Sequence, residues 1–164
     1  MKTRMMLAFL IVFSLATVAM AQTKISGTVQ CGKPDPMHKI DVGDRPNHSF
    51  LIEQFKCTWT KPMEIEGVKN KEGMGTDFHE INGNSSRFHG LYADNMANGD
   101  KAQYRYEGTA TLKDGVPQSA EDKWKSSGGT GKIKGIKSHG TCKGIPGADG
   151  SMTWECEGEY ELPK

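Results

Sequence analysis

The chain has 164 residues, of which 25% are charged and 35% hydrophobic, and its formal net charge is +1. A near-neutral chain lacks the concentrated positive surface that nucleic acid or an anionic membrane attracts, so we expect neither as a partner. The length suits a signal segment followed by one domain.

The first 21 residues have the organisation of a secretory signal peptide. Lys2 and Arg4 precede an apolar run over residues 7–20, and Ala19-Met20-Ala21 matches the small-x-small pattern of a cleavage site. The apolar run is shorter than the about 20 residues that span a bilayer, which argues against an uncleaved membrane anchor. We therefore expect cleavage before Gln22, no stable membrane insertion afterwards, and a secreted or periplasmic location.

Residues 22–164 would then form a single domain, with 19 basic residues against 20 acidic ones once Lys2 and Arg4 are removed. Runs with period-two alternation, separated by turn residues, predict antiparallel strands with one buried and one wet face. The expected strands are residues 24–31, 49–59, 64–69, 75–81, 87–93, 104–112, 131–143 and 152–162. About eight strands at this spacing, with no convincing helix, predict an all-β sandwich or barrel. Residues 32–47, rich in Pro and Asp, are the longest segment expected to be irregular.

The glycine-rich stretch SSGGTGKIKGIKSHG, residues 126–140, superficially resembles a phosphate-binding loop. Such a loop requires glycine five residues before Gly131 and Ser or Thr after Lys132, whereas Ser126 and Ile133 occupy those positions. No nucleotide site or other cofactor is therefore expected. The glycines instead predict a turn with positive φ and a bend in a strand.

The same stretch resembles a known family signature. Residues 128–137, GGTGKIKGIK, are similar to the G-G-T-G-x-[FL]-x-G-[IV] signature of the allene oxide cyclase and dirigent-like barrel superfamily, particularly its uncharacterised exported bacterial members. The likeness is supported by Asn98-Gly99-Asp100 and by Tyr106-Glu107-Gly108-Thr109, and it is weak before about residue 96. It implies one antiparallel barrel of about eight strands with an apolar lumen. Some relatives cyclise or steer reactive lipid or phenolic intermediates, but their active-site residues have no counterpart that aligns here, so we assign no catalytic residue.

Four cysteines, an even number in an exported chain, predict two disulfides. None of them lies in the close pairs that zinc sites use. The last hairpin turns at residues 147–150, which places Cys142 and Cys156 within one residue of direct opposition. We therefore predict the pairs Cys142–Cys156 and Cys31–Cys57.

Two histidines form a weak candidate metal site. His79 and His89 flank the turn at residues 82–85, so they could approach each other across a hairpin, and Asp77 would share the face of His79. The alternative is a solvated histidine pair near a loop. We assign no metal site on this evidence.

The aromatic residues expected to face the lumen are Trp59, Tyr104, Tyr106, Trp154 and Tyr160. A barrel of eight strands either fills its interior with side chains or holds one small ligand, and the sequence leaves both alternatives open. Tyr hydroxyl and Trp N–H groups inside such a lumen would orient the polar end of a ligand.

The leading hypothesis is therefore an exported barrel that binds a small apolar or amphipathic molecule without catalysis. An isomerase or cyclase would need a titratable lumen group with a perturbed pKa, for which Glu53, His79 and His89 are the candidates. A structural or interaction module of the cell envelope is a third alternative. The identity of the ligand and the oligomeric state are left open.

Overall fold

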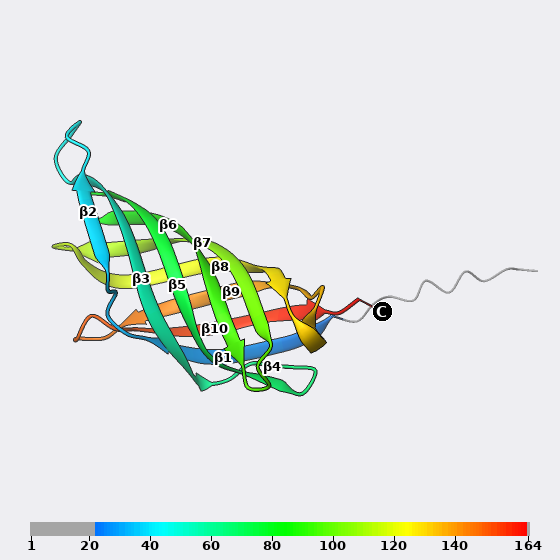
Figure 1. Cartoon of the computed structure of the whole chain (residues 1–164). Coiled ribbons are helices and arrows are strands. Elements are labelled where there is room, and N and C mark those ends of the chain that lie inside the picture. Colours follow the sequence, from blue (N-terminus) through cyan, green and yellow to red (C-terminus); the bar gives the residue numbers. More distant parts are fainter. Residues whose placement is uncertain (1–21, 164) are drawn as a thin grey trace, which may run out of the picture.

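A computed structural model describes residues 22–163, and these residues form an all-β fold (Figure 1). The strands are β1 (Thr23–Cys31), β2 (Met37–Asp41), β3 (His48–Lys61), β4 (Glu64–Ile65), β5 (Val68–Asn82), β6 (Ser85–Met96), β7 (Lys101–Lys113), β8 (Val116–Gly129), β9 (Lys137–Pro146) and β10 (Met152–Glu161). One 3-10 turn, η1 (Gly131–Ile133), joins β8 to β9. No helix between residues 22 and 163 is long and apolar enough to cross a membrane. The expected signal peptide, residues 1–21, lies outside the described residues.

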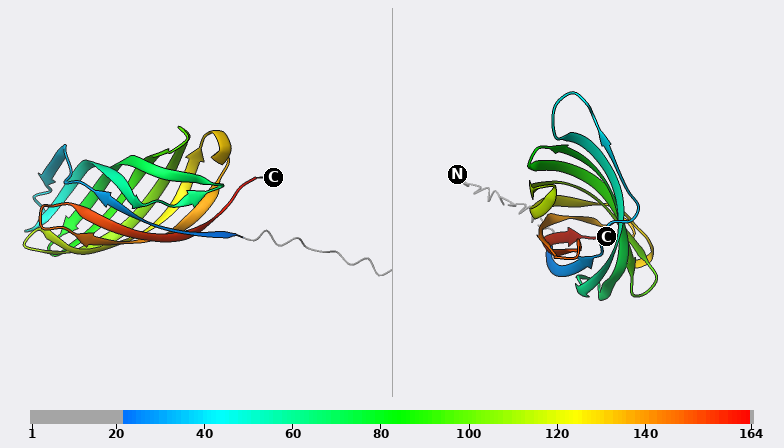
Figure 2. Two further views of the ribbon diagram at one scale, coloured as in Figure 1. Left: turned by 90° about the horizontal axis from the view of Figure 1, so that it is seen from below. Right: turned by 90° about the vertical axis from the view of Figure 1, so that its left-hand side faces the viewer.

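Eight strands close into an antiparallel barrel. Their order is β3-β1-β10-β9-β8-β7-β6-β5, and β5 returns to pair with β3 from His48–Asn82 to Thr58–Glu72. The views in Figure 2 show the sheet curling around until its first and last strands meet. Closure pairs the backbone groups that an open sheet would leave free at its edges. The expectation of a single antiparallel barrel of about eight strands is confirmed.

Two short strands extend this ring and correct the sequence expectation. β2 pairs with the first half of β3, where Met37 faces Glu53 and Asp41 faces Ser49, so the segment expected to be irregular contains a strand. Every residue of β2 is exposed. The sequence therefore has no alternation of apolar and polar residues that would have identified this strand. The expected strand over residues 64–69 is instead a hairpin, because Glu66 and Gly67 have positive φ and separate β4 from β5.

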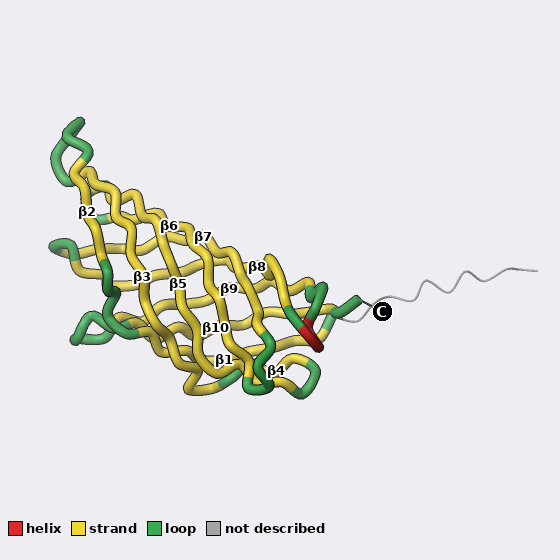
Figure 3. The backbone as a smooth tube through the Cα atoms, viewed as in Figure 1, coloured by secondary structure: helices red, strands yellow, loops and turns green. Residues whose placement is uncertain are grey.

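β8 is the barrel strand that the sequence analysis missed. Its inward positions include Ala120, Asp122 and Trp124, and this mixed set conceals the alternation on which strand prediction depends. β7 pairs with β8 along most of its length. Conversely, the expected strand over residues 131–143 begins only at Lys137, after η1, which appears as the short red segment in Figure 3.

The glycine-rich stretch therefore forms the β8–η1–β9 connection. Gly131 and Gly135 have backbone φ angles of 52° and 76°, which residues with a Cβ atom rarely adopt. Further along, Gly140 makes room for the indole of Trp124, because a Cβ there would overlap the ring. The predicted positive φ in this turn is confirmed, but Gly135 lies in the connection between η1 and β9, not at a bend within a strand, and the close packing at Gly140 was not predicted.

Both predicted disulfides are present. Cys31–Cys57 joins β1 to β3, and Cys142–Cys156 joins β9 to β10. In each pair the two cysteines lie directly opposite each other in the strand register. All four residues are buried. Two disulfides agree with a protein that folds in an oxidising compartment.

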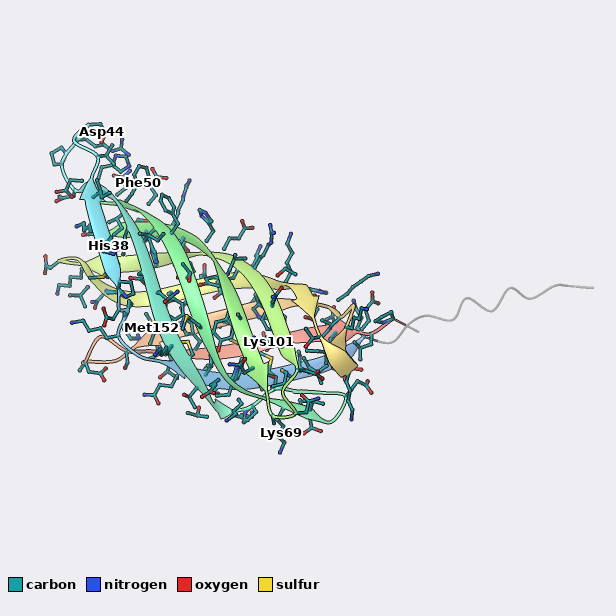
Figure 4. All side chains as sticks on the ribbon, viewed as in Figure 1. His38, Asp44, Phe50, Lys69, Lys101 and Met152 are labelled. Carbon is teal, nitrogen blue, oxygen red and sulfur yellow. A yellow bond between two sulfur atoms is a disulfide. The ribbon has the colours of Figure 1, made fainter. Side chains whose placement is uncertain are left out.

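The inside and the outside of the barrel carry different side chains. At the end that holds η1 and β4, Ile65 and Ile133 are fully buried and plug the lumen. The outer face is mostly polar but exposes Phe50, Ile52 and Phe78 on β3 and β5. Figure 4 shows Phe50 projecting from the outer surface near Asp44, at the end of the barrel away from Lys69.

Candidate functional site

A cavity of about 90 Å³ lies inside the barrel beyond this plug. One ordered water needs only about 10–15 Å³, so the cavity has room for several waters or a small organic molecule. Its aromatic wall consists of Phe55, Trp59, Tyr92, Tyr104, Tyr106, Trp124 and Trp154. The rest of the lining consists of Val29, Met63, both disulfides, Asp77 and Asp122. The lumen is thus packed at one end and contains a cavity in the middle.

Four of the five aromatic residues predicted to face the lumen line this cavity: Trp59, Tyr104, Tyr106 and Trp154. Tyr160 also points inward and is buried, but it packs near the plug, where its hydroxyl accepts a hydrogen bond from the Glu66 backbone N–H at 3.3 Å.

Three lining aromatic residues, Phe55, Tyr92 and Trp124, were not predicted. Trp124 was missed because β8 itself was missed. Tyr92 lies in an expected strand, and Tyr92 and Asp94, two residues apart, both face inward. The period-two pattern therefore contained the signal that would have identified Tyr92.

Two carboxyl groups bring charge to an otherwise apolar wall. Burial raises the pKa of Asp77 to about 6, against the opposing effect of the neighbouring His79 imidazole, and the hydroxyl of Tyr106 donates a hydrogen bond to its Oδ1 atom. Burial, assisted by the nearby charge of Asp77, raises the pKa of Asp122 to about 7. Both groups can therefore change protonation state near neutral pH.

Several polar atoms of the lining are buried without a hydrogen-bond partner among the described residues. They are the hydroxyls of Tyr92 and Tyr104, the indole nitrogen of Trp124 and the Oδ1 atom of Asp122. The residues that carry these three donors and one acceptor all line the cavity. A buried polar group without a partner costs about 1–3 kcal/mol, which a polar group of a bound molecule would recover.

A second polar cluster, formed by Glu53, Asp77 and His79, adjoins the cavity through Asp77. The Nε2 atom of His79 lies 3.5 Å from a Glu53 carboxylate oxygen and 3.5 Å from one of Asp77. Its Nδ1 atom lies 3.0 Å from the Ser86 hydroxyl. Burial alone would lower the pKa of His79, but the two carboxylates outweigh it and raise the pKa to about 9.

The predicted approach of His79 and His89 is wrong. The register of the β5–β6 hairpin pairs His79 with Phe88 and Phe78 with His89, one residue away from the expected pairing. A shift of one residue moves a side chain to the opposite face, so His89 is exposed on the outer surface, next to the ring of Phe78. Of the three titratable candidates for the lumen, Glu53 and His79 lie inside and His89 does not.

Glu53 completes the inner cluster because it lies directly opposite Asp77 in the β3–β5 register. Asp77 shares the inner face with His79, as the alternation predicted. The grouping of a β3 residue with two β5 residues depends on barrel closure, and no local spacing in the sequence indicates it.

A third buried carboxyl, Asp94, lies outside the cavity lining and has neutral partners. Trp59 Nε1 donates a hydrogen bond to its Oδ2 atom at 2.9 Å, and the side-chain amide of Asn70 donates to the same oxygen. Burial raises the pKa of Asp94 to about 7. This group ties β3, β5 and β6 together near the plug.

No protein-family model and no curated protein matches this chain. Among solved structures, a protein of unknown function from the DUF3224 family of Shewanella oneidensis MR-1 is similar, with a TM-score of 0.50 and 13% sequence identity. The similarity covers 88% of this chain and 99% of that one. At this level of identity the likeness concerns the fold alone.

Proposed function

We propose that this protein binds a small amphipathic molecule in the barrel lumen without transforming it. The observation that carries the proposal is the aromatic cavity of about 90 Å³, whose wall contains buried polar atoms that lack partners among the described residues. The aromatic side chains would cover the apolar body of the ligand. The Tyr92 and Tyr104 hydroxyls and Asp122 would hold its polar end.

Tryptophan fluorescence tests the proposal directly. The chain has three tryptophans, and Trp59, Trp124 and Trp154 all line the cavity, so every indole reports on it. We expect saturable changes in emission when small phenols or medium-chain fatty acids and alcohols are titrated into the protein. Native mass spectrometry of protein from its own host would identify a retained ligand.

Two variants separate lumen binding from surface adsorption. Val29→Phe adds a ring to the cavity wall and should abolish the response, whereas Ile145→Ala trims an exposed outer side chain and should leave it unchanged. A filled core or a purely structural envelope module would show no saturable response to any compound in the panel. An equal response in the Val29→Phe variant would place binding elsewhere.

An isomerase or cyclase is the second candidate, and the perturbed carboxyl of Asp122 favours it. A group with a pKa of about 7 beside an apolar cavity can both accept and donate a proton near neutral pH. Asp122→Asn keeps an acceptor oxygen for the polar end of the ligand but cannot exchange a proton, so it should weaken ligand binding only slightly and abolish conversion of the ligand. Unchanged ligand after prolonged incubation with the wild-type protein would exclude this candidate.

We also infer export and membership of the allene oxide cyclase and dirigent-like barrel superfamily. Export is supported by the two disulfides. Membership of the superfamily is supported by the closed barrel and by the GGTG stretch, residues 128–131, which lies at the junction of β8 and η1. N-terminal sequencing of exported protein should begin at Gln22. Exported material that retains Met1 would contradict cleavage.

A further inference from the structure

We propose that Glu53, Asp77 and His79 form a binding site for a divalent transition-metal ion of the zinc type in the wall of the lumen. The proposal does not depend on the proposed binding of an amphipathic molecule. It arises from barrel closure, which places Glu53 of β3 opposite Asp77 of β5, with His79 two residues further along the same inner face.

The three side chains present one donor atom each to a common point. One imidazole nitrogen and two carboxylate oxygens lie within 4.8 Å of one another. The side chains of His79, Glu53 and Asp77 have exposed fractions of 14%, 13% and 7%, so water competes little for these atoms. Nitrogen and oxygen donors in this combination bind zinc and its neighbours in the first transition row, and the imidazole disfavours Mg²⁺ and Ca²⁺.

The separations match those between the ligands of a metal ion. Zinc binds nitrogen and oxygen at about 2.0–2.2 Å, so two donors at the corners of a tetrahedron lie about 3.3–3.6 Å apart. His79 Nε2 lies 3.5 Å from both carboxylate oxygens. A direct charge-assisted hydrogen bond would instead bring nitrogen and oxygen to about 2.7–2.9 Å.

A cation between these atoms is an electrostatic requirement. His79 Nε2 is buried, has no hydrogen-bond partner among the described residues and faces two carboxylates. Either a proton on the ring or a metal ion must separate the nitrogen from the oxygens, because the bare lone pairs repel one another. The near-equal distances to two separate carboxylates favour an ion at the centre over a proton directed at one of them.

Residues outside the trio hold two of the ligands in place. The Ser86 hydroxyl contacts Nδ1 of His79, and the Tyr106 hydroxyl donates to the other oxygen of Asp77. Such outer contacts orient metal ligands, and their loss typically weakens metal affinity by about 10–100-fold. Three protein ligands leave a fourth position open, which is the arrangement of zinc sites that accept a further ligand.

Calorimetric titration of tag-free, chelator-treated protein with ZnCl₂ tests this site. We expect one Zn²⁺ per chain, with proton release that differs between buffers, because a metal ion displaces any proton on the ring. Glu53→Gln and His79→Asn should each weaken binding by more than about 100-fold, and Ser86→Ala by about 10-fold. His89→Asn is the matched control, because it removes a histidine from the outer face of the same hairpin.

Circular dichroism and thermal unfolding will establish that each variant is folded, and Glu53→Gln keeps the shape of its side chain should His79→Asn fail to fold. The proposal is overturned if the wild-type protein binds no stoichiometric Zn²⁺. It is also overturned if Glu53→Gln leaves the affinity unchanged, or if His89→Asn weakens it as much as the lumen variants do. Ligand fluorescence measured with and without Zn²⁺ shows separately whether the lumen binds an amphipathic molecule.

Discussion

Two of the buried aspartates of the barrel lie in different surroundings, Asp94 near the plug and Asp77 in the cavity wall. Burial raises the pKa of both, to about 7 and about 6. Asp94 accepts hydrogen bonds from the neutral side chains of Trp59 and Asn70. Asp77 lies beside an imidazole and a second carboxylate and faces the cavity. The comparison teaches that burial alone does not make a carboxyl functional: its partners and its access to open space decide its role.

Replacing each aspartate in turn tests this comparison most strongly, because we expect the largest difference in unfolding free energy between these two variants. Asp94→Ala leaves the Trp59 and Asn70 donors without their acceptor, and each such donor costs about 1–3 kcal/mol, so the unfolding free energy should fall by about 2–6 kcal/mol. Asp77→Asn keeps an acceptor for Tyr106 and should cost only about 1 kcal/mol. Urea unfolding in the presence of chelator measures both. A greater loss for Asp77→Asn would make Asp77 the structural group.

The pH dependence of stability should depend on Asp94. The pKa of Asp94 is about 7 in the folded protein, whereas that of a free aspartate side chain is 3.8, so the folded state keeps the proton over a range in which the unfolded state loses it. The stabilisation is therefore complete below about pH 4 and is lost as the pH rises through about 7. Each unit of difference in pKa corresponds to about 1.4 kcal/mol.

Urea unfolding of chelator-treated protein at pH 4.5, 6 and 7.5 should show stability falling across this range. The Asp94→Asn variant should show a shallower profile than the wild type, because one buried carboxyl no longer titrates while Asp77 and Asp122 still contribute to the slope. A wild-type profile that rises with pH would contradict the assignment.

Removing one hydrogen-bond donor that contacts each aspartate tests the same comparison more finely. Trp59→Phe deletes the indole N–H that bonds Asp94, and Tyr106→Phe deletes the hydroxyl that bonds Asp77. We expect each to lower the unfolding free energy by about 1 kcal/mol. Zinc titration should distinguish them: Tyr106→Phe should weaken Zn²⁺ binding by about 10-fold or more, and Trp59→Phe should leave it unchanged. Equal effects on zinc would mean that the two clusters are coupled.

The smallest effect is expected on the outer surface. His89 is exposed beside Phe78, and surface substitutions away from buried networks usually change stability by less than about 0.5 kcal/mol. His89→Asn should therefore change neither the unfolding midpoint nor ligand fluorescence. A marked loss in either measurement would show that the outer face contributes to the lumen site.

The sequence by itself determined the strand class, five inward aromatic residues and the pairing of the cysteines. Much of this depends on local rules: alternation assigns Trp154 and Cys156 to the inner face, and a short hairpin places Cys142 opposite Cys156. Local rules worked because successive side chains of a strand point to opposite faces. A strand that separates core from solvent therefore shows a pattern of apolar and polar residues that repeats every two residues.

Tertiary structure alone decided where the cavity lies and which acids share it. β8 escaped prediction because its inner face mixes Asp122 with Ala120 and Trp124, which a lumen tolerates and a dry core does not. Glu53 reaches Asp77 and His79 only because β3 and β5 close the barrel, and His89 is excluded by a register shift of one residue. Such contacts depend on long-range pairing energies, and no segment of a chain encodes them on its own.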